Sequence, residues 1–131
     1  MRNAQEMKHA DQLTNWLGDL FRSIDERDAV SFVKFLTPDA TFRFGSAPPT
    51  RGRSAIQDVV EAFFSTIAGC RHDLSRTWHD DDTVVCEGKV TYTRHDGSEI
   101  TLPFANVFVL CDGLVDRYSI YTDVNPLYQH G

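Results

Sequence analysis

The sequence lacks features that would point to nucleic-acid or membrane proteins. Its 13 Lys and Arg residues stand against 19 Asp and Glu, which gives a formal net charge of −6. A nucleic-acid partner requires a clustered basic face, so we expect none. The chain also has no long apolar run, and its amino terminus, MRNAQEMKHADQ, is polar. We therefore expect no membrane span, no signal peptide and a cytoplasmic location.

Cysteine is scarce, and its spacing suggests no pairing. Cys70, Cys86 and Cys111 are an odd number and form no CxxC motif, which is typical of free thiols in a reducing compartment. His72 and His79 would lie on opposite faces of an ideal strand, and no cluster of three ligands is evident. The sequence therefore predicts no metal site and no cofactor.

The chain does contain enough apolar material for a core. Its 131 residues are 41% hydrophobic and 11% aromatic, which is typical of one compact domain. A chain of this length can bury a core without disulfides or a metal. We expect a single domain over residues 1–131, with its core at about 11–128.

Three helices are predicted in the amino-terminal half. Apolar residues spaced by three and four from Leu13 to Ile24 predict an amphipathic helix. Asp28 can cap a second, shorter helix, which stops at Thr37-Pro38-Asp39. A capping box at Ser54–Gln57 and apolar positions as far as Ile67 predict the third helix.

The second half is rich in Val, Thr, Tyr and Phe and predicts β-strands. Turn signals at Asp80-Asp81-Asp82, Asp96-Gly97 and Asp112-Gly113 divide it into an antiparallel meander. The expected strands are Arg71–His79, Thr83–Arg94, Glu99–Cys111 and Leu114–Tyr121, with a short earlier strand at Thr41–Phe44 and a loop at Gly45–Gly52. Helices followed by strands indicate an α+β domain in which helices pack on one face of the sheet.

The predicted strands are long compared with the helices that would cover them. Strands of roughly 9 to 13 residues span about 30 to 43 Å, and such strands must twist and curl. A curled sheet with helices across its mouth leaves a cone-shaped cavity. We therefore expect a small-molecule pocket on the helix-facing side of the sheet.

Several phrases and the order of elements resemble one superfamily. The phrases are Leu36-Thr-Pro-Asp-Ala-Thr41, Gly52-Arg-Ser-Ala-Ile56, Asp112-Gly113 and Tyr121-Thr-Asp123. They resemble the nuclear transport factor 2-like superfamily, in particular its SnoaL-like and ketosteroid-isomerase-like branch, from about Leu13 to Tyr128. The resemblance implies a strongly curved, cone-shaped antiparallel sheet covered by three helices from the amino-terminal half, a cystatin-like α+β roll. The superfamily includes isomerases, polyketide cyclases, epoxide hydrolases, dehydratases and non-catalytic members, so fold alone does not define the reaction.

The resemblance also implies where acid–base residues would stand. In ketosteroid isomerases a tyrosine donor corresponds to Leu20, the aspartate base to Phe44 and a second oxyanion donor to Asn106. In SnoaL-type cyclases an aspartate active in proton transfer corresponds to Ile120. Three of these four positions are apolar here, whereas the Asn106 amide can still donate a hydrogen bond. These mechanisms therefore do not transfer directly.

Among the other polar residues of the last strand and its end, Tyr118 has two interpretations. If position 120 faces the cavity, strand alternation sends Tyr118 and Asp116 to the same face. Tyr118 is then a hydrogen-bond donor to a ligand, or a wall residue whose hydroxyl meets a backbone carbonyl or a water. Asp116 lies near a turn and is expected to be solvated, and Asp123 is interpreted as structural, holding a loop or helix end.

His72 is the candidate general base. By alternation it shares a strand face with Leu74, Arg76 and Trp78. Its reference pKa lies near neutrality, which suits proton transfer, although a hydrogen-bonded wall histidine is the alternative. His72 with Asn106 or Tyr118 is the acid–base constellation that the sequence offers.

The expected pocket wall is apolar and aromatic, and consists of Trp16, Leu20, Phe44, Phe64, Trp78, Tyr92, Phe108 and Ile120. The place of Tyr92 depends on the strand at 84–94. There the hydrophobic pattern sends the even positions inward, and the family comparison suggests the opposite parity. A β-bulge could reconcile the two, and we follow the hydrophobic pattern.

Two kinds of function follow from these observations. The first is a SnoaL-like protein that binds a hydrophobic, oxygenated, cyclic compound and acts on it by isomerase-, cyclase- or hydrolase-type acid–base chemistry without a cofactor. The alternative is a non-catalytic binding or dimerisation module. A homodimer would form through the outer sheet face, which carries Ser75, Thr77, Thr91, Val107 and Val109.

Overall fold

The computed structural model describes residues 16–129, which form a helical layer on a long sheet. An amino-terminal helix, described over residues 16–25, opens the chain. The elements that follow are α2 (Ala29–Phe32), the 3₁₀ helix η1 (Val33–Phe35), β1 (Leu36–Phe44), β2 (Thr50–Arg51), α3 (Arg53–Phe64), β3 (Gly69–Asp80), β4 (Thr83–Thr93), β5 (Glu99–Cys111), β6 (Leu114–Tyr121) and α4 (Asn125–Tyr128). No helix within residues 16–129 is long and apolar enough to span a membrane.

The sheet has six strands in the order β2-β1-β6-β5-β4-β3. Strands β3 to β6 form the predicted antiparallel meander. However, β1 pairs with β6 in parallel, with Phe42 opposite Tyr118, so the expected antiparallel sheet carries one parallel pair and is mixed. A parallel pair needs a long crossover, and no local turn signal marks it in the sequence. Strand β1 is also longer than expected, because it begins at Leu36 rather than Thr41.

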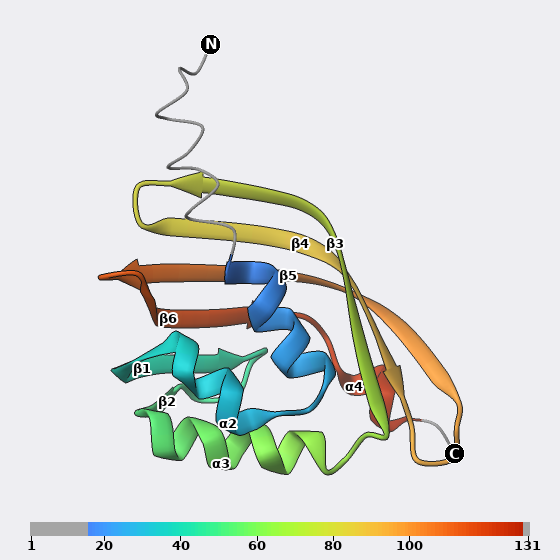
Figure 1. Cartoon of the computed structure of the whole chain (residues 1–131). Coiled ribbons are helices and arrows are strands. Elements are labelled where there is room, and N and C mark those ends of the chain that lie inside the picture. Colours follow the sequence, from blue (N-terminus) through green and yellow to red (C-terminus); the bar gives the residue numbers. More distant parts are fainter. Residues whose placement is uncertain (1–15, 130–131) are drawn as a thin grey trace.

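The helices cover one face of this sheet, as expected for an α+β fold. Figure 1 shows the amino-terminal helix, α2 and α3 on the same side, while β3, β4 and β5 bend around the end of this helical layer. The short α4 lies at that end, where the Arg94 guanidinium donates hydrogen bonds to the carbonyl oxygens of Pro126 and Leu127. The helices therefore lie on the concave side of the curved sheet (Figure 1).

The two predicted helix caps have different outcomes. Asp28 caps α2 as expected, because its Oδ1 accepts a hydrogen bond from the backbone N–H of Ser31 at 3.1 Å. The capping box at Ser54–Gln57 is wrong. Helix α3 begins at Arg53, two residues before the start that a Ser54 cap implies, and its N-cap is Gly52 at φ 93°. Gln57 instead donates to Glu61. Glycine takes this positive φ without strain, and no side-chain cap is used.

A β-bulge in β3 changes which of its side chains face the helices. The register with β4 shifts between Leu74 and Arg76. A Cβ placed on the facing Gly88 would lie 2.0 Å from the carbonyl oxygen of Asp73, so the bulged strand can approach only a glycine. Beyond the bulge the alternation is reversed. The expectation that Trp78 shares a face with His72 is therefore wrong, and His79 takes the inward register instead.

Strand β4 itself follows the hydrophobic pattern. Its even positions Val84, Cys86, Val90 and Tyr92 are all buried, so the parity taken from the pattern is confirmed. A second register shift occurs between β5 and β6, where Val109 pairs with Arg117 but Leu110 pairs with Val115. Asp116 therefore has no partner residue on β5 and does not follow the alternation of β6. Val115 and Tyr118 are consequently both buried, whereas Asp116 is exposed and accepts a hydrogen bond from Thr37.

Candidate functional site

A largely apolar cavity lies between α3, the amino-terminal helix and the inner face of the sheet. Its volume is about 70 Å³ for the centres of water-sized molecules, several times what one water needs. The wall is formed by Ile24, Phe32, Phe42, Phe44, Val59, Val60, Phe63, Phe64, Cys70, His72, Val90, Tyr92, Phe104, Asn106, Tyr118, Ile120 and Thr122. A cavity of this composition suits a hydrophobic molecule with a few polar groups.

Two buried polar groups in this wall lack hydrogen-bond partners. Asn106 is 2% exposed and Tyr118 is 1% exposed. Neither Asn106 Oδ1 nor the Tyr118 hydroxyl oxygen has a partner among the residues described. Leaving such a group unpaired costs about 1 to 3 kcal/mol. The two residues are diagonal neighbours on β5 and β6. Such neighbours are about 7 to 8 Å apart, with their Cβ atoms somewhat closer, so groups on one ligand can reach both.

Tyr118 can serve as a hydrogen-bond donor rather than as a base. Burial raises the pKa of its phenol well above the ordinary value, because the phenolate would lose its hydration. The ring is held by aromatic neighbours, with centroid distances of 4.5 Å to Phe108 and 5.4 Å to Phe42. A protonated and firmly positioned hydroxyl is suited to a carbonyl or hydroxyl oxygen of a ligand.

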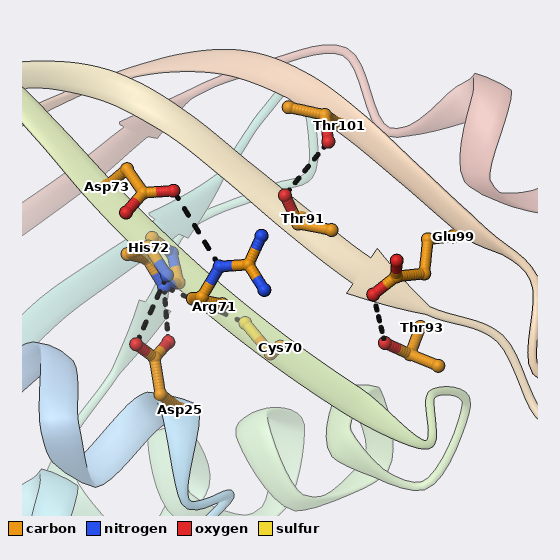
Figure 2. Close-up of polar contacts among 9 residues, drawn as sticks. All are labelled: Asp25, Cys70, Arg71, His72, Asp73, Thr91, Thr93, Glu99 and Thr101. Atoms are coloured by element: carbon orange, nitrogen blue, oxygen red, sulfur yellow. Dashed lines mark hydrogen bonds and ion pairs between the residues drawn. The ribbon is translucent and has the colours of Figure 1, made fainter.

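At the other end of the cavity, His72 is paired with Asp25. His72 Nδ1 lies 2.7 Å from Asp25 Oδ1, and the backbone N–H of His72 donates to Asp25 Oδ2 at 3.1 Å. Figure 2 shows the Asp25 carboxylate, at the end of the amino-terminal helix, pointing at His72 on β3. In neutral imidazole this carboxylate fixes the hydrogen on Nδ1, so Nε2 carries the free lone pair.

The imidazole is also held from both sides by aromatic rings. Its centroid lies 4.8 Å from that of Phe21 and 5.2 Å from that of Phe104. His72 contributes to the cavity wall and also to an outer groove that includes Arg22, Asp25 and Leu74. It therefore forms part of the wall between the cavity and the outer surface, with its carboxylate partner on the outer side.

Cys70 completes a three-residue cluster with this pair. Its Sγ lies 3.7 Å from His72 Nδ1, and one ligand atom from each of Asp25, Cys70 and His72 lies within 4.8 Å of the others. Burial, and next the charge of Asp25, raise the pKa of the Cys70 thiol. The expectation that no cluster of three metal ligands exists is therefore wrong. The contact that completes the cluster joins residues 47 apart in the chain.

The two polar ends of the cavity are well separated. In the sheet register, His72 on β3 pairs with Val90 on β4, and Val90 pairs with Leu102 on β5. Asn106 lies four residues beyond Leu102 on β5. In a flat sheet this separation is on the order of 15 Å between backbones, and curvature shortens it.

The structure places most of the predicted site residues at this cavity. His72, Asn106, Tyr118, Phe44, Phe64, Tyr92 and Ile120 all contribute to its wall. Leu20 and Phe108 are instead fully buried in the core, and Trp16 packs edge-on against Phe108 at 5.1 Å. Trp78 is 46% exposed and lies outside the wall, since the bulge turns it to the other face.

Two site residues escaped the sequence analysis. Asp25 lies at the last helical residue before the turn at 26–27, and the helical pattern gave no reason to single it out. Cys70 precedes His72 by two, a spacing that puts both on one strand face. The Cys-x-His spacing was therefore the usable signal. Asp123, in contrast, has the structural role expected of it, because its Oδ1 accepts from the backbone N–H of Asn125 at the start of α4.

The remaining cysteines are also free, as predicted. Burial raises the pKa of Cys86 to about 12, which makes this thiol an apolar core group rather than a nucleophile. Cys111 is exposed at the end of β5.

A curved sheet with helices on one face and a largely apolar cavity between them is the architecture of a nuclear transport factor 2-like domain. Residues 17–118 match the SnoaL-like domain, and the chain belongs to this family. No curated protein matches the sequence.

Solved structures share the fold at low identity. TerC co-crystallised with polyporic acid has a TM-score of 0.78 at 18% identity, over 90% of this chain and 96% of that one. A nuclear transport factor 2-like protein of unknown function from Burkholderia pseudomallei has a TM-score of 0.81 at 15% identity, over 90% and 95%. An LEH-like epoxide hydrolase from M. tuberculosis has a TM-score of 0.75 at 14% identity, over 90% and 87%.

Proposed function

We propose that this protein binds a hydrophobic, oxygenated, cyclic compound in the cavity and acts on it by acid–base chemistry. The observation that carries the proposal is the pair of unpartnered polar atoms, Asn106 Oδ1 and the Tyr118 hydroxyl, in a largely apolar wall. A ligand hydroxyl can donate to Asn106, and a ligand oxygen can accept from Tyr118. Binding thus removes the free-energy penalty of both groups.

The Asp25–His72 pair supports a catalytic role. In this scheme Nε2 of His72 takes a proton from a hydroxyl or from a carbon next to a carbonyl. The electron pair left behind delocalises through the conjugated ligand toward the oxygen that Tyr118 holds. Asp25 keeps Nδ1 protonated and stabilises the imidazolium. The proton then returns to another atom of the ligand, so the overall change is an isomerisation, cyclisation or elimination without a cofactor.

The alternative is a binding protein without catalysis. Phe44 and Ile120 line the cavity where related enzymes carry acids or bases, which favours this alternative. The two functions make the same prediction for binding at Asn106 and Tyr118. They differ in whether substitution of His72 abolishes turnover of a bound compound.

The first test is a ligand screen on metal-free, EDTA-treated protein. Steroids, terpenoid epoxides, aromatic polyketide-like compounds and polyporic acid would be tested by thermal shift. A ligand at 100 times its Kd adds about 2.7 kcal/mol, which raises the Tm by several degrees. Tyr118→Phe should weaken a hit by roughly 3- to 10-fold, and Asn106→Leu should weaken it further. Tyr121→Phe, on the same strand but 58% exposed, is the matched control.

The results of this screen distinguish an enzyme from a binding protein without catalysis. Binding of a hit unaffected by both substitutions would place the site elsewhere and overturn the assignment. Turnover of the hit that His72→Asn abolishes, with binding retained, supports the enzyme. Binding without turnover of any hit supports the non-catalytic alternative.

We also propose that the protein forms a homodimer through the outer sheet face. Val107 and Val109 are half-buried there, and Trp78 joins them in place of the expected Thr77 because of the bulge in β3. No described helix covers this face (Figure 1). Aromatic and β-branched side chains on a sheet face suit a self-complementary twofold contact.

A further inference from the structure

The Asp25–Cys70–His72 cluster has the composition of a transition-metal site. It combines a carboxylate, a thiol and an imidazole, and all three side chains are half-buried. Zn²⁺ is bound in proteins by these three ligand types. Harder cations such as Mg²⁺ and Ca²⁺ prefer oxygen ligands alone, so a thiol here selects for softer ions.

The distances within the cluster are close to those of a tetrahedral site. With Zn–N and Zn–S bonds of about 2.0 and 2.3 Å, the nitrogen and sulfur ligands lie roughly 3.5 Å apart. The distance from Cys70 Sγ to His72 Nδ1 is 3.7 Å. Asp25 Oδ1, now 2.7 Å from Nδ1, would have to move by less than about 1 Å to make room for the ion.

The position of Asp25 also favours a cation at this point. It is the last helical residue of the amino-terminal helix, which runs to residue 25. A negative charge at a helix carboxyl terminus is disfavoured by the helix dipole. A divalent ion bound by the carboxylate would offset this unfavourable interaction.

We propose that Asp25, Cys70 and His72 bind one Zn²⁺-class transition-metal ion. Binding would release the Cys70 thiol proton and transfer the imidazole hydrogen from Nδ1 to Nε2. In this site the remaining coordination position would face the cavity, whose wall includes Cys70 and His72. A ligand oxygen can occupy it, as in zinc sites with three protein ligands.

Metal binding would also change what His72 can do. With the ion on Nδ1, Nε2 carries the hydrogen and is a donor, so the metal-loaded protein has no imidazole base. This consequence for activity rests on the proposed function, whereas metal binding itself does not. The ion would then switch the cavity between proton transfer and metal coordination of the ligand.

Cobalt provides a direct spectroscopic test. Untagged, EDTA-treated protein is titrated with Co²⁺, and the near-ultraviolet thiolate-to-cobalt charge-transfer band is recorded. We expect one ion per chain, displacement by Zn²⁺, and loss of the band in Cys70→Ser. Asp25→Asn and His72→Gln should each weaken Co²⁺ binding by more than the roughly 10- to 100-fold typical of outer-shell partners. Cys111→Ser, which alters an exposed thiol, should leave the band unchanged.

Several results would overturn the proposal. A missing band would do so, as would a band that persists in Cys70→Ser. Weak, non-stoichiometric colour lost in Cys111→Ser would indicate an adventitious ion only. If Cys70→Ser does not fold, unchanged Co²⁺ affinity in His72→Gln is decisive against the site. Ligand binding by the metal-free protein is measured separately, so failure of the metal site and failure of the proposed function are distinguishable.

Discussion

At the residue scale, the hydroxyl of Tyr118 makes no hydrogen bond with any residue that the structure describes. It is buried and unpartnered, so we predict that Tyr118→Phe raises the free energy of unfolding by about 1 kcal/mol. Urea denaturation of the ligand-free protein measures this change. The matched control Tyr121→Phe should have no effect, because that hydroxyl is exposed. A destabilised Tyr118→Phe would mean that the hydroxyl has a partner and would remove the argument for a ligand.

The sequence could identify part of the site at this scale but not all of it. Strand alternation and an apolar pattern suffice to place Tyr118, Asn106 and His72 on an inner face. The place of Asp25 in the site depends on a contact between the end of a helix and a residue 47 positions further along the chain. No local periodicity encodes this contact. Simple alternation places Trp78 on the wrong face, because the bulge between Leu74 and Arg76 reverses the alternation.

At the element scale, Gly88 determines how β3 lies against β4. A methyl group at this position would be 2.0 Å from the carbonyl oxygen of Asp73, so β3 must move away or lose its bulge. We predict that Gly88→Ala lowers the free energy of unfolding by more than about 2 kcal/mol, at the upper end of ordinary substitutions. Urea denaturation measures this change, and weaker binding of a cavity ligand should accompany it, since His72 lies on the same strand.

Gly18 is the matched control for this substitution. It lies in the amino-terminal helix, is exposed, and has no atom within 4 Å of an added Cβ. Gly18→Ala should therefore stabilise the protein by up to about 1 kcal/mol through helix propensity. If both substitutions had the same small effect, close packing at Gly88 would not be the cause of the bulge.

The cap of α2 predicts a pH effect. Hydrogen bonds from the Ser31 side chain, and next from the Ser31 backbone N–H, lower the pKa of Asp28 below its ordinary value of 3.8. The folded state therefore holds its proton less tightly than the unfolded state. The resulting stabilisation is present above pH 3.8 and is lost as the pH falls through the folded-state pKa.

Asp28→Asn tests this effect, because Asn also caps helices but does not titrate. We expect the Tm of the wild type to fall more steeply than that of Asp28→Asn as the pH is lowered below 3.8. Asp39→Asn, at an exposed position on β1, is the control and should follow the wild type. Parallel Tm curves for the wild type and Asp28→Asn would contradict a role for the carboxylate.

Local sequence signals predict some elements of the fold better than others. The three Asp-containing turns fix the meander, because each joins two neighbouring antiparallel strands by a short hairpin loop. The pairing of β1 with β6 joins segments far apart in the chain and needs no turn of its own. A capping box at Ser54 and Gln57 predicts a helix start at residue 55, whereas α3 begins at Arg53, because Gly52 ends the preceding loop at a positive φ.

At the scale of the whole molecule, the two faces of the curved sheet differ in what covers them. The inner face, under the helices, forms the core and the cavity. The outer face has no described helix over it (Figure 1), and it still carries apolar side chains at Trp78, Val107 and Val109. Contiguous apolar groups on an uncovered face are typical of an interaction surface.

The proposed homodimer can be tested at Trp78. We expect sedimentation at micromolar concentration to show a dimer for the wild type. Trp78→Glu should shift it toward monomer, because each twofold contact would then bury two unpaired carboxylates. Val30→Glu introduces the same charge at an exposed apolar residue on α2, on the helical side, and should leave the dimer intact. A monomeric wild type, or a dimer disrupted by Val30→Glu but not by Trp78→Glu, would rule out the outer face. Ligand binding in the inner cavity should survive Trp78→Glu, since the two faces share no side chain.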